Sequence, residues 1–379
     1  MAIKSKAAVL HKSGLPRPYV KSQPILIEEV EIDEPEFEEV LVKVFAAGLC
    51  HSDLSVVNGN RPKEMPILIG HEGAGIIEKI GEGVEGLEVG DHVVFVFIAA
   101  CGYCIKCKEG KPSLCTPGML TSSAGTLLSG KKKIKLKNKY INHHVGVSCF
   151  SEYTVVSSKS LVKVNKDIPL SEAALMGCAV ITGAGAVFNT AKIRVGSTNA
   201  IFGLGGTGLA ALMGARAAGA SKVIGVDLLD SKLNLAKDLG ADLVLKAGDD
   251  TIEKIKKFTE DGVDYAFECV GSEKSLEMAY KCLKRGGEVI SSGLSNPKNN
   301  FVINHVDLVV GEKIIKGSYL GSCIPSRDIP AYIDLYKTGR LPINNLMSDK
   351  ISLEQINEGF DKLADGDVVR QIIIFNHSI

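Results

Sequence analysis

One segment restricts the fold of this chain more than any other, because it combines three spaced glycines with a fixed order of apolar runs. A short apolar run, residues 200–202, leads into the sequence Gly203-Leu204-Gly205-Gly206-Thr207-Gly208. An Ala- and Leu-rich stretch follows, and a second apolar run, residues 223–226, ends at Asp227. The pattern G-x-G-x-x-G between a strand and a helix, with an acidic residue about 20 positions later, is typical of a dinucleotide-binding βαβ unit.

The residues of this motif have separate physical tasks. Gly203 makes the tight turn, Gly205 lets the backbone approach the pyrophosphate, and Gly208 lets the helix pack closely on its strand. Gly206 is a further candidate coenzyme-binding residue of the motif, and the N-terminus of the following helix offers N–H groups and a partial positive charge to the phosphates. Asp227 is expected to accept the hydroxyl groups of the adenosine ribose and to repel a 2′-phosphate, so NAD is favoured over NADP. The alternative is a glycine-rich turn in another kind of βαβ unit.

The same alternation of strand and helix continues downstream. The runs ADLVL at 241–245, VDYAFECVG at 263–271 and GGEVISSGL at 286–294 have the apolar character of buried strands, with helical stretches between them. This rhythm predicts a doubly wound α/β domain of the Rossmann type.

A second feature is a cluster of four cysteines within fifteen residues, with the spacing C-x2-C-x2-C-x7-C: Cys101, Cys104, Cys107 and Cys115. Four thiolates suit a tetrahedral zinc ion, and Gly102 and Gly110 supply the backbone freedom for tight turns around it. A complete ligand set leaves no open position for a substrate, so the site is expected to be structural. Iron–sulfur ligation and four unligated thiols are the alternatives, although ferredoxin spacing would place the fourth cysteine closer to the third.

An open metal site is a further hypothesis, built on three scattered segments. Cys50 lies in AAGLCHSDLS, His71 and Glu72 lie in LIGHEGAG, and Cys178 lies in LMGCAVITG. Two thiolates and one imidazole would leave the fourth position of a zinc ion free. Each segment alone is unspecific, because a lone cysteine is commonly a small core residue and a His-Glu pair is commonly solvated.

Composition excludes several other classes of function. The 379 residues suggest about two domains, and the charges balance, with 44 Lys+Arg against 44 Asp+Glu. A protein that binds nucleic acid usually carries a basic excess. No apolar run is long enough to span a bilayer, and the N-terminal segment lacks a signal core, so we expect a cytoplasmic protein without a membrane partner. Ten cysteines in such a chain indicate metal binding in a reducing compartment.

Taken together, GHEGAG, the four-cysteine segment and FGLGGTG occur in this order and at separations that resemble the zinc-dependent alcohol dehydrogenases of the medium-chain dehydrogenase/reductase superfamily. The resemblance covers essentially the whole chain. It implies a GroES-like, mostly β catalytic domain at 1–179 and 323–379, with a structural zinc lobe at about 95–116. A Rossmann NAD-binding domain is implied at 180–322, with the active site in the cleft between the two. The long segment 116–149 resembles the liver-type branch and implies a homodimer.

The resemblance also implies a role for each residue of the open metal site. Cys50, His71 and Cys178 would hold a catalytic zinc, and Glu72 would lie near enough to approach the metal transiently. Asp53 would hydrogen-bond the far nitrogen of His71 and fix its tautomer, and the alternative role of Asp53 is that of a helix N-cap. Two zinc ions per chain are therefore expected, one catalytic and one structural.

Five further residues receive roles in the same way. Ser52 would take the proton of the alcohol, while His51 and Arg370 would contact the coenzyme pyrophosphate. Lys232 would contact the adenosine ribose, and Thr182 would lie near the nicotinamide. Without the resemblance, Lys232 and Arg370 would be interpreted as solvated charges.

The implied activity is the NAD-linked, reversible oxidation of a primary or secondary alcohol to an aldehyde or ketone through a zinc-bound alkoxide. The alternative is an S-hydroxymethylglutathione (formaldehyde) dehydrogenase, and a more distant one is a non-catalytic NAD-binding protein on this fold. The chain departs from many relatives at Ser55, where they have a histidine that passes the proton to solvent. Water or His51 is the expected substitute.

The substrate is the least determined part of the prediction. By position, Phe97, Val145 and Leu294 would line an apolar pocket. Arg61 at the pocket rim and the lysine-rich segment that begins at Lys131 raise the alternative of an anionic alcohol or aldehyde. A solvated loop and an outward-facing arginine are the simpler interpretation.

Overall fold

The computed structural model describes residues 2–377 and separates into two compact units. The first unit contains the residues up to Cys178, Ile324–Pro330 and the residues from Met347 onward. The second contains Ala179–Cys323 and Ala331–Leu346. The sequence assigns 323–379 as one piece to the catalytic domain, whereas the structure groups Ala331–Leu346 with the nucleotide-binding unit.

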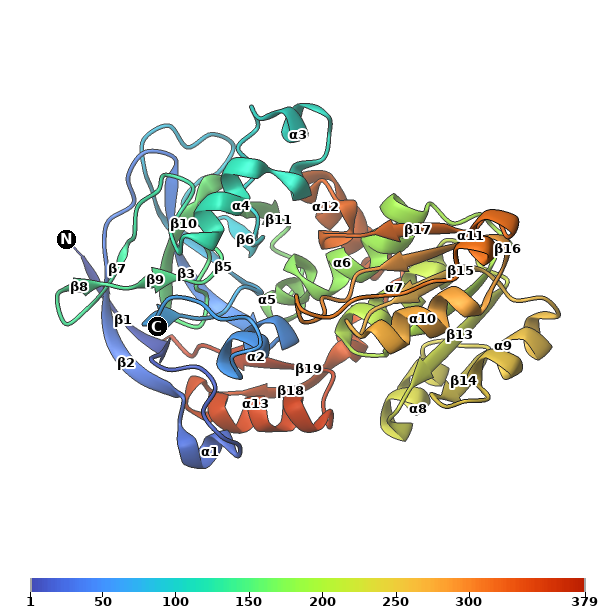
Figure 1. The fold of residues 1–379 in the computed structure, drawn as a ribbon. Coiled ribbons are helices and arrows are strands. Elements are labelled where there is room, and N and C mark those ends of the chain that lie inside the picture. Colours follow the sequence, from blue (N-terminus) through green and yellow to red (C-terminus); the bar gives the residue numbers. More distant parts are fainter. Residues whose placement is uncertain (1, 378–379) are drawn as a thin grey trace. The chain divides into compact units, whose positions relative to one another are not determined.

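Two sheets form the frame of the first unit (Figure 1). The strands of the first sheet, in spatial order, are β8 (Lys139–Tyr140), β7 (Ile134–Leu136), β2 (Ile25–Ile32), β1 (Ile3–Leu10), β4 (Ile67–Leu68) and β9 (Asn142–His143). Those of the second are β11 (Leu161–Val164), β6 (His92–Phe95), β5 (Gly73–Ile80), β3 (Glu39–Gly48), β19 (Arg370–Ile374) and β18 (Met347–Ile351), with β10 (Tyr153–Ser157) also paired to β3.

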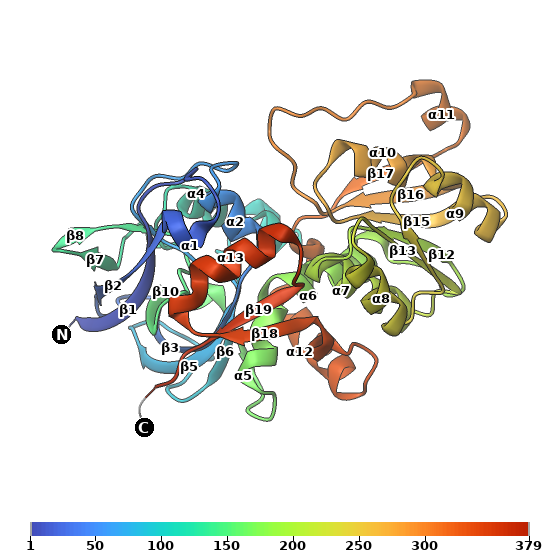
Figure 2. The same cartoon turned by 90° about the horizontal axis from the view of Figure 1, so that it is seen from below.

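The helices of the first unit are short: α1 (Tyr19–Ser22), α2 (His51–Val57), α3 (Ile105–Lys108), α4 (Thr116–Ser123), α5 (Leu170–Ala173) and α13 (Ile356–Asp365). The longest, α13, is amphipathic, because Ile356, Phe360 and Leu363 recur at helical spacing and are all buried. It lies beside β19 and β18 and covers the core of the second sheet (Figures 1 and 2).

The second unit is a parallel sheet in the order β14-β13-β12-β15-β16-β17. Its strands are β12 (Thr198–Phe202), β13 (Lys222–Asp227), β14 (Leu243–Lys246), β15 (Val263–Glu268), β16 (Leu283–Ser291) and β17 (Ile314–Gly317). Its helices are α6 (Ala179–Gly185), α7 (Gly206–Ala217), α8 (Asp230–Asp238), α9 (Thr251–Thr259), α10 (Glu273–Lys281) and α11 (His305–Val310), while α12 (Pro325–Lys337) has residues in both units.

This strand order confirms the predicted Rossmann fold. From β12 the chain adds β13 and β14 on one side, and it then returns to add β15, β16 and β17 on the other side. Dinucleotides bind at such a switch point, which here lies between β12 and β15. The three downstream apolar runs form β14, β15 and β16, as predicted. Of the cysteines outside the two metal motifs, Cys149, Cys282 and Cys323 are fully buried, whereas Cys269 is only half-buried.

Among residues 2–377, no single helix is long and apolar enough to cross a membrane. One bent pair of helical segments, Leu170–Gly177 with Ala179–Ala191, is long and apolar enough for a membrane span by length and composition alone.

Candidate active site

Three residues from distant segments meet in the first unit, as the open-site hypothesis predicts. Cys50 immediately precedes α2, His71 lies between β4 and β5, and Cys178 follows a short 3₁₀ turn at Ala174–Gly177. The two sulfur atoms are 4.0 Å apart, and Nε2 of His71 lies 3.3 Å from Sγ of Cys178. All three side chains are buried.

This geometry fits a zinc ion. Thiolates about 2.3 Å from a tetrahedral zinc lie about 3.8 Å from each other, close to the separation found here. Contact with Cys178 lowers the pKa of Cys50 well below its usual range, and the same contact raises the pKa of Cys178. Two buried thiols so close together can both ionise only with a cation between them, so this donor set requires a metal to be fully deprotonated.

Asp53 orients the histidine ligand. Its carboxylate is fully buried, and Oδ1 lies 2.8 Å from Nδ1 of His71. Nδ1–H therefore donates a hydrogen bond to Asp53, and this tautomer leaves the Nε2 lone pair for a metal. Oδ2 accepts the Cys50 N–H at 3.2 Å, so Asp53 is the third helical residue of a capping box in which Cys50 is the N-cap. The histidine-orienting role of Asp53 therefore has its geometry, whereas the alternative of an N-cap residue is wrong. Burial alone would raise the pKa of Asp53, but His71 and His144 lower it overall.

Glu72 and Arg370 form a second buried pair beside the metal ligands. The Glu72 carboxylate is fully buried, its Oε1 lies 3.4 Å from Nε of Arg370, and neither carboxylate oxygen has a hydrogen-bond donor among the described residues. Burial raises the pKa of Glu72 to about 7, against the opposing charge of Arg370. Arg370 donates through Nη1 to the Leu49 carbonyl at 2.7 Å, so it is not the solvated charge of the simpler interpretation.

The four-cysteine segment folds into a separate cluster, as predicted. Sγ of Cys101 lies 4.0 Å from Sγ of Cys107, and Sγ of Cys104 lies 3.9 Å from Sγ of Cys115. Backbone N–H groups point at two of the sulfurs, with Cys104 N donating to Cys101 and Gly118 N to Cys115. These four thiols and the Cys50–His71–Cys178 set are the structural and the catalytic zinc site of this fold.

The dinucleotide motif adopts the geometry that its glycines predict. Gly203 has φ +87°, a conformation that permits the tight turn. A Cβ at Gly208 would lie 1.7 Å from the Gly203 carbonyl oxygen, whereas a Cβ at Gly205 would meet no atom within 4 Å. Asp227 is the last residue of β13, and its Oδ2 accepts the Leu204 N–H at 2.7 Å, which ties the carboxylate to the motif.

The other predicted residues fall into three groups. Ser52 and His51 form the first turn of α2, half-buried and exposed respectively. Thr182 on α6 and Lys232 on α8 are half-buried in the second unit. The pocket residue Phe97 packs edge-on against His71, with ring centroids 5.5 Å apart.

Of the remaining pocket residues, Val145 is half-buried and Leu294 is exposed. Three lysines of the lysine-rich segment are engaged in ion pairs within the protein. Lys131 pairs with Glu36, Lys133 is buried between Glu36 and Glu39, and Lys135 pairs with Asp33 at 2.7 Å. Arg61 is half-buried.

Sequence reasoning missed two basic residues near this site. His144 is buried, with Nδ1 only 3.1 Å from Oδ1 of Asp53. Lys63 is half-buried; its burial and the charge of Arg61 lower its pKa, and its own charge acts on His144. The doubled histidine in INHHVGV was the available signal, but nothing local shows which segment it contacts.

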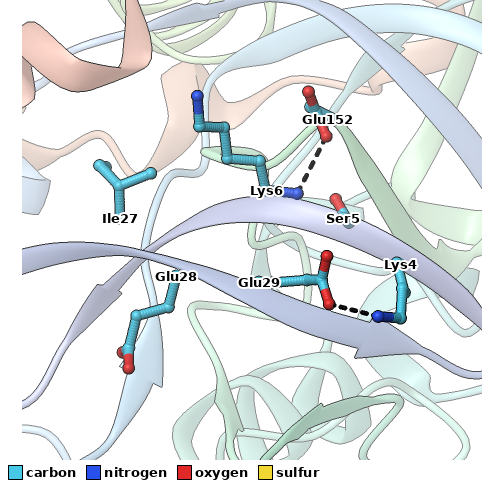
Figure 3. A pocket seen from close by; sticks show the side chains of 7 residues that line it. All are labelled: Lys4, Ser5, Lys6, Ile27, Glu28, Glu29 and Glu152. Atoms are coloured by element: carbon cyan, nitrogen blue, oxygen red, sulfur yellow. Dashed lines mark hydrogen bonds and ion pairs between the residues drawn. The ribbon is translucent and has the colours of Figure 1, made fainter.

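A pocket lies elsewhere in the first unit, lined mainly by residues of β1 and β2 (Figure 3). Several of its charged side chains are engaged: the Lys4 ammonium donates to Glu29 at 2.7 Å, and Glu152 accepts the backbone N–H of Lys6 at 2.9 Å. None of the predicted site residues lines it.

Two family descriptions match the chain. The alcohol dehydrogenase GroES-like domain matches residues 36–166, and the zinc-binding dehydrogenase domain matches residues 206–338. Among curated proteins, alcohol dehydrogenase class-3 of Drosophila melanogaster is 37% identical over 358 residues, covering 93% of this chain and 94% of the relative. S-(hydroxymethyl)glutathione dehydrogenase of Synechocystis sp. is 36% identical over 376 residues, covering 98% of this chain and 100% of the relative.

Solved structures agree over the whole chain. An alcohol dehydrogenase zinc-binding domain protein from Burkholderia ambifaria superposes with a TM-score of 0.94 at 33% identity, covering 100% of both chains. Benzyl alcohol dehydrogenase from Acinetobacter calcoaceticus gives a TM-score of 0.92 at 34% identity, covering 99% of this chain and 100% of the other.

Proposed function

Because this chain belongs to the zinc-dependent alcohol dehydrogenases of the medium-chain dehydrogenase/reductase superfamily, we propose that it oxidises a primary or secondary alcohol reversibly to an aldehyde or ketone with NAD. The observation that carries the proposal is the buried set of Cys50, His71 and Cys178. Three protein ligands are the number that a catalytic zinc uses while it keeps one position for a substrate oxygen.

Bound there, zinc would supply Lewis acidity, which lowers the pKa of a bound water from about 16 to about 7 and favours ionisation of an alcohol in the same way. The residues of the chain prepare for that step. Asp53 holds the His71 tautomer that leaves Nε2 free for the metal, and Phe97 packs edge-on against the ring. The uncharged ring of Phe97 favours a dry, apolar surrounding for the reacting oxygen.

Ser52 is the proposed first acceptor of the alcohol proton, because its half-buried hydroxyl lies two residues from Cys50 at the start of α2. Ser55 is unsuited to carry the proton onward. Its hydroxyl donates to the His51 carbonyl at 2.8 Å, an ordinary bond within the helix. His51 is exposed and is therefore the proposed link between Ser52 and water.

The preference for NAD is supported by Asp227. Its Oδ1 accepts the N–H groups of Leu228 and Leu229 at 2.8 and 3.1 Å, so the carboxylate is held at the end of β13. A fixed negative charge there favours free ribose hydroxyls over a 2′-phosphate.

The alternative of an S-hydroxymethylglutathione dehydrogenase gains support from the curated relatives, which include one of that name and a class-3 alcohol dehydrogenase. The benzyl alcohol dehydrogenase among the solved relatives supports a simpler alcohol instead. Arg61 and Lys63 are the basic residues by which we propose that a negatively charged substrate would be favoured, whereas the lysines at 131, 133 and 135 are engaged in ion pairs.

An NAD-coupled panel of alcohols tests these alternatives. We expect NADH formation with primary or secondary alcohols. We also expect that adding glutathione is not required for any oxidation of formaldehyde. If Arg61 and Lys63 contact the substrate, kcat/KM for a carboxylate-bearing alcohol should exceed that for the neutral alcohol of equal length, and Lys63→Gln should reduce this ratio by about tenfold or less, the value of one solvent-accessible charge contact. Turnover of formaldehyde only with glutathione would establish the alternative, and no NADH from any alcohol would refute the proposal.

A homodimer is the proposed assembly, and the second unit supports it. β17 is the edge strand of the parallel sheet, and its Ile314 and Ile315 are 41% and 39% exposed. Val309 and Val310 on the adjoining α11 are each 60% exposed. Exposed apolar residues beside an open strand edge are typical of a surface that pairs with another chain.

Replacing Val309 by aspartate should weaken this assembly. A charge in the centre of an apolar contact must be desolvated without a partner, so we expect a shift toward monomer in analytical ultracentrifugation. The matched control is Val195→Asp, because Val195 is 85% exposed in the same unit but lies before β12. A wild-type protein that is monomeric at all concentrations, or an equal effect of both variants, would contradict the proposed surface.

A further inference from the structure

A buried carboxylate in the first unit is shared by two imidazoles, and only one of them belongs to the metal ligand set. Oδ1 of Asp53 lies 2.8 Å from Nδ1 of His71 and 3.1 Å from Nδ1 of His144. Oδ2 of Asp53 accepts the Cys50 N–H. Asp53, His71 and His144 are at most 3% exposed, so this contact has no competition from bulk water.

The ring of His144 also restricts the ring of His71. The two rings stand at 89° with centroids 5.6 Å apart, and Phe97 makes a second edge contact with His71 at 85° and 5.5 Å. His144 Nδ1 is close to Asp53 but not aligned as a directed hydrogen bond, so the contact is mainly between a ring dipole and the carboxylate charge. For that attraction Nδ1 must carry the proton, because two lone pairs would otherwise face each other.

The backbone after His144 is held in a costly conformation that keeps this side chain in place. Val145 and Ser148 have φ of +47° and +54°, values that are rare for residues with a Cβ and rarest for β-branched ones. The Ser148 hydroxyl stabilises the turn, since it accepts the His144 N–H at 2.8 Å and donates to the Leu68 carbonyl at 2.7 Å. Left-handed residues of this kind persist where surrounding contacts determine them, and they cluster at functional sites.

We propose that His144 is a positioning residue of the catalytic metal site, which holds the Asp53 carboxylate against His71 and thereby fixes the ring that presents Nε2 to the metal. The inference rests on the proposed function only for the catalytic role of that metal. Removing the hydrogen-bond partner of a metal-ligating histidine typically lowers metal affinity or activity by about 10- to 100-fold.

The test compares four variants by metal retention, which requires no substrate. His144→Phe keeps a ring but has no donor, and we expect the Cys50–His71–Cys178 site to lose its metal to a graded chelator at about 10- to 100-fold lower chelator concentration. The four-cysteine site should keep its metal, so metal per chain should fall from about two to about one under conditions that leave the wild type loaded.

Two polar variants distinguish the loss of the Nδ1–H donor from a general disturbance of the fold. His144→Asn places an amide nitrogen where Nδ1 lies and should restore retention to within a few-fold of wild type, whereas His144→Gln places it where Nε2 lies and should not. This pair decides the outcome even if the phenylalanine variant does not fold. The visible spectrum of the cobalt-substituted enzyme should follow the same order, because it reports the ligand geometry at the catalytic site.

His143→Phe is the matched control. His143 is the adjacent residue, is also fully buried, and accepts the Lys133 N–H at 3.1 Å, with no contact to Asp53 among its described hydrogen bonds. It should retain metal as the wild type does. Equal metal loss in the His143 and His144 variants, or wild-type retention and an unchanged cobalt spectrum in both His144→Phe and His144→Gln, would overturn the inference. Wild-type protein that binds two metals but oxidises no alcohol would refute the proposed function and leave this comparison intact.

Discussion

Replacing Cys178 by alanine is expected to abolish alcohol oxidation while coenzyme binding survives. Cys178 supplies one of the two thiolates, and the remaining Cys50 and His71 offer too few ligands for a stable catalytic zinc. Even about 4 kcal/mol of lost Lewis-acid stabilisation lowers a rate about a thousandfold, so kcat/KM should fall by at least that factor. The measurements are metal content per chain, steady-state kinetics and NAD affinity by calorimetry.

Cys282→Ala is the control for this experiment. Cys282 is a fully buried cysteine of the second unit, and its thiol bonds the Ala279 carbonyl instead of any metal-ligand atom. This variant should keep two metals per chain and full activity. Full activity of the Cys178 variant with one metal per chain would show that the Cys50–His71–Cys178 site is not where the reaction occurs.

Replacing Gly208 or Gly205 of the dinucleotide motif by alanine is expected to have two different effects, one on stability and one on NAD affinity. At Gly208, the new Cβ would lie 1.7 Å from the Gly203 carbonyl oxygen, so α7 must move away from its strand. We expect the free energy of unfolding of the second unit to fall by about 3 kcal/mol or more, as for severe overpacking, and NAD binding to be lost with it. Denaturant unfolding and calorimetric titration with NAD measure the two effects.

Gly205→Ala should fold almost normally. No protein atom lies within 4 Å of the added Cβ, and the residue has φ −76°, which alanine adopts readily. The coenzyme pyrophosphate is predicted to approach the backbone at Gly205, where the added Cβ would block it. The NAD dissociation constant should therefore rise at least about tenfold, while the free energy of unfolding changes by about 1 kcal/mol or less. Wild-type affinity in Gly205→Ala would contradict the predicted coenzyme position.

The parts of the site that the sequence predicts well are those built from short segments. The glycine motif and the four cysteines each lie within about fifteen residues, so spacing alone restricts which atoms can converge. The open metal site is different, because Cys50, His71 and Cys178 come from three separated segments that are individually unspecific. The family resemblance, not local physics, selected them, and the tertiary structure brings their ligand atoms together.

The ion pairs of the lysine-rich segment also could not be predicted from the sequence. The lysine-rich segment 131–139 has the composition of a solvated or anion-steering loop, yet Lys133 is 2% exposed and lies 3.0 Å from Glu39. The partner glutamates lie almost a hundred residues earlier in the chain. Only the pairing of β7 with β2 brings the two segments together, so the sequence pattern could not assign the lysines a role.

By itself, the sequence determined the Rossmann unit, the preference for a dinucleotide and the four-cysteine metal cluster, because local spacing and backbone freedom are sufficient for each. Tertiary structure alone decided that His144 shares the Asp53 carboxylate with His71. The parallel pairing of β4 with β9 places the segments before these two histidines side by side, and the strained turn at Val145–Ser148 directs the second one inward. Contacts between segments about seventy residues apart depend on sheet register and burial, which no local pattern encodes.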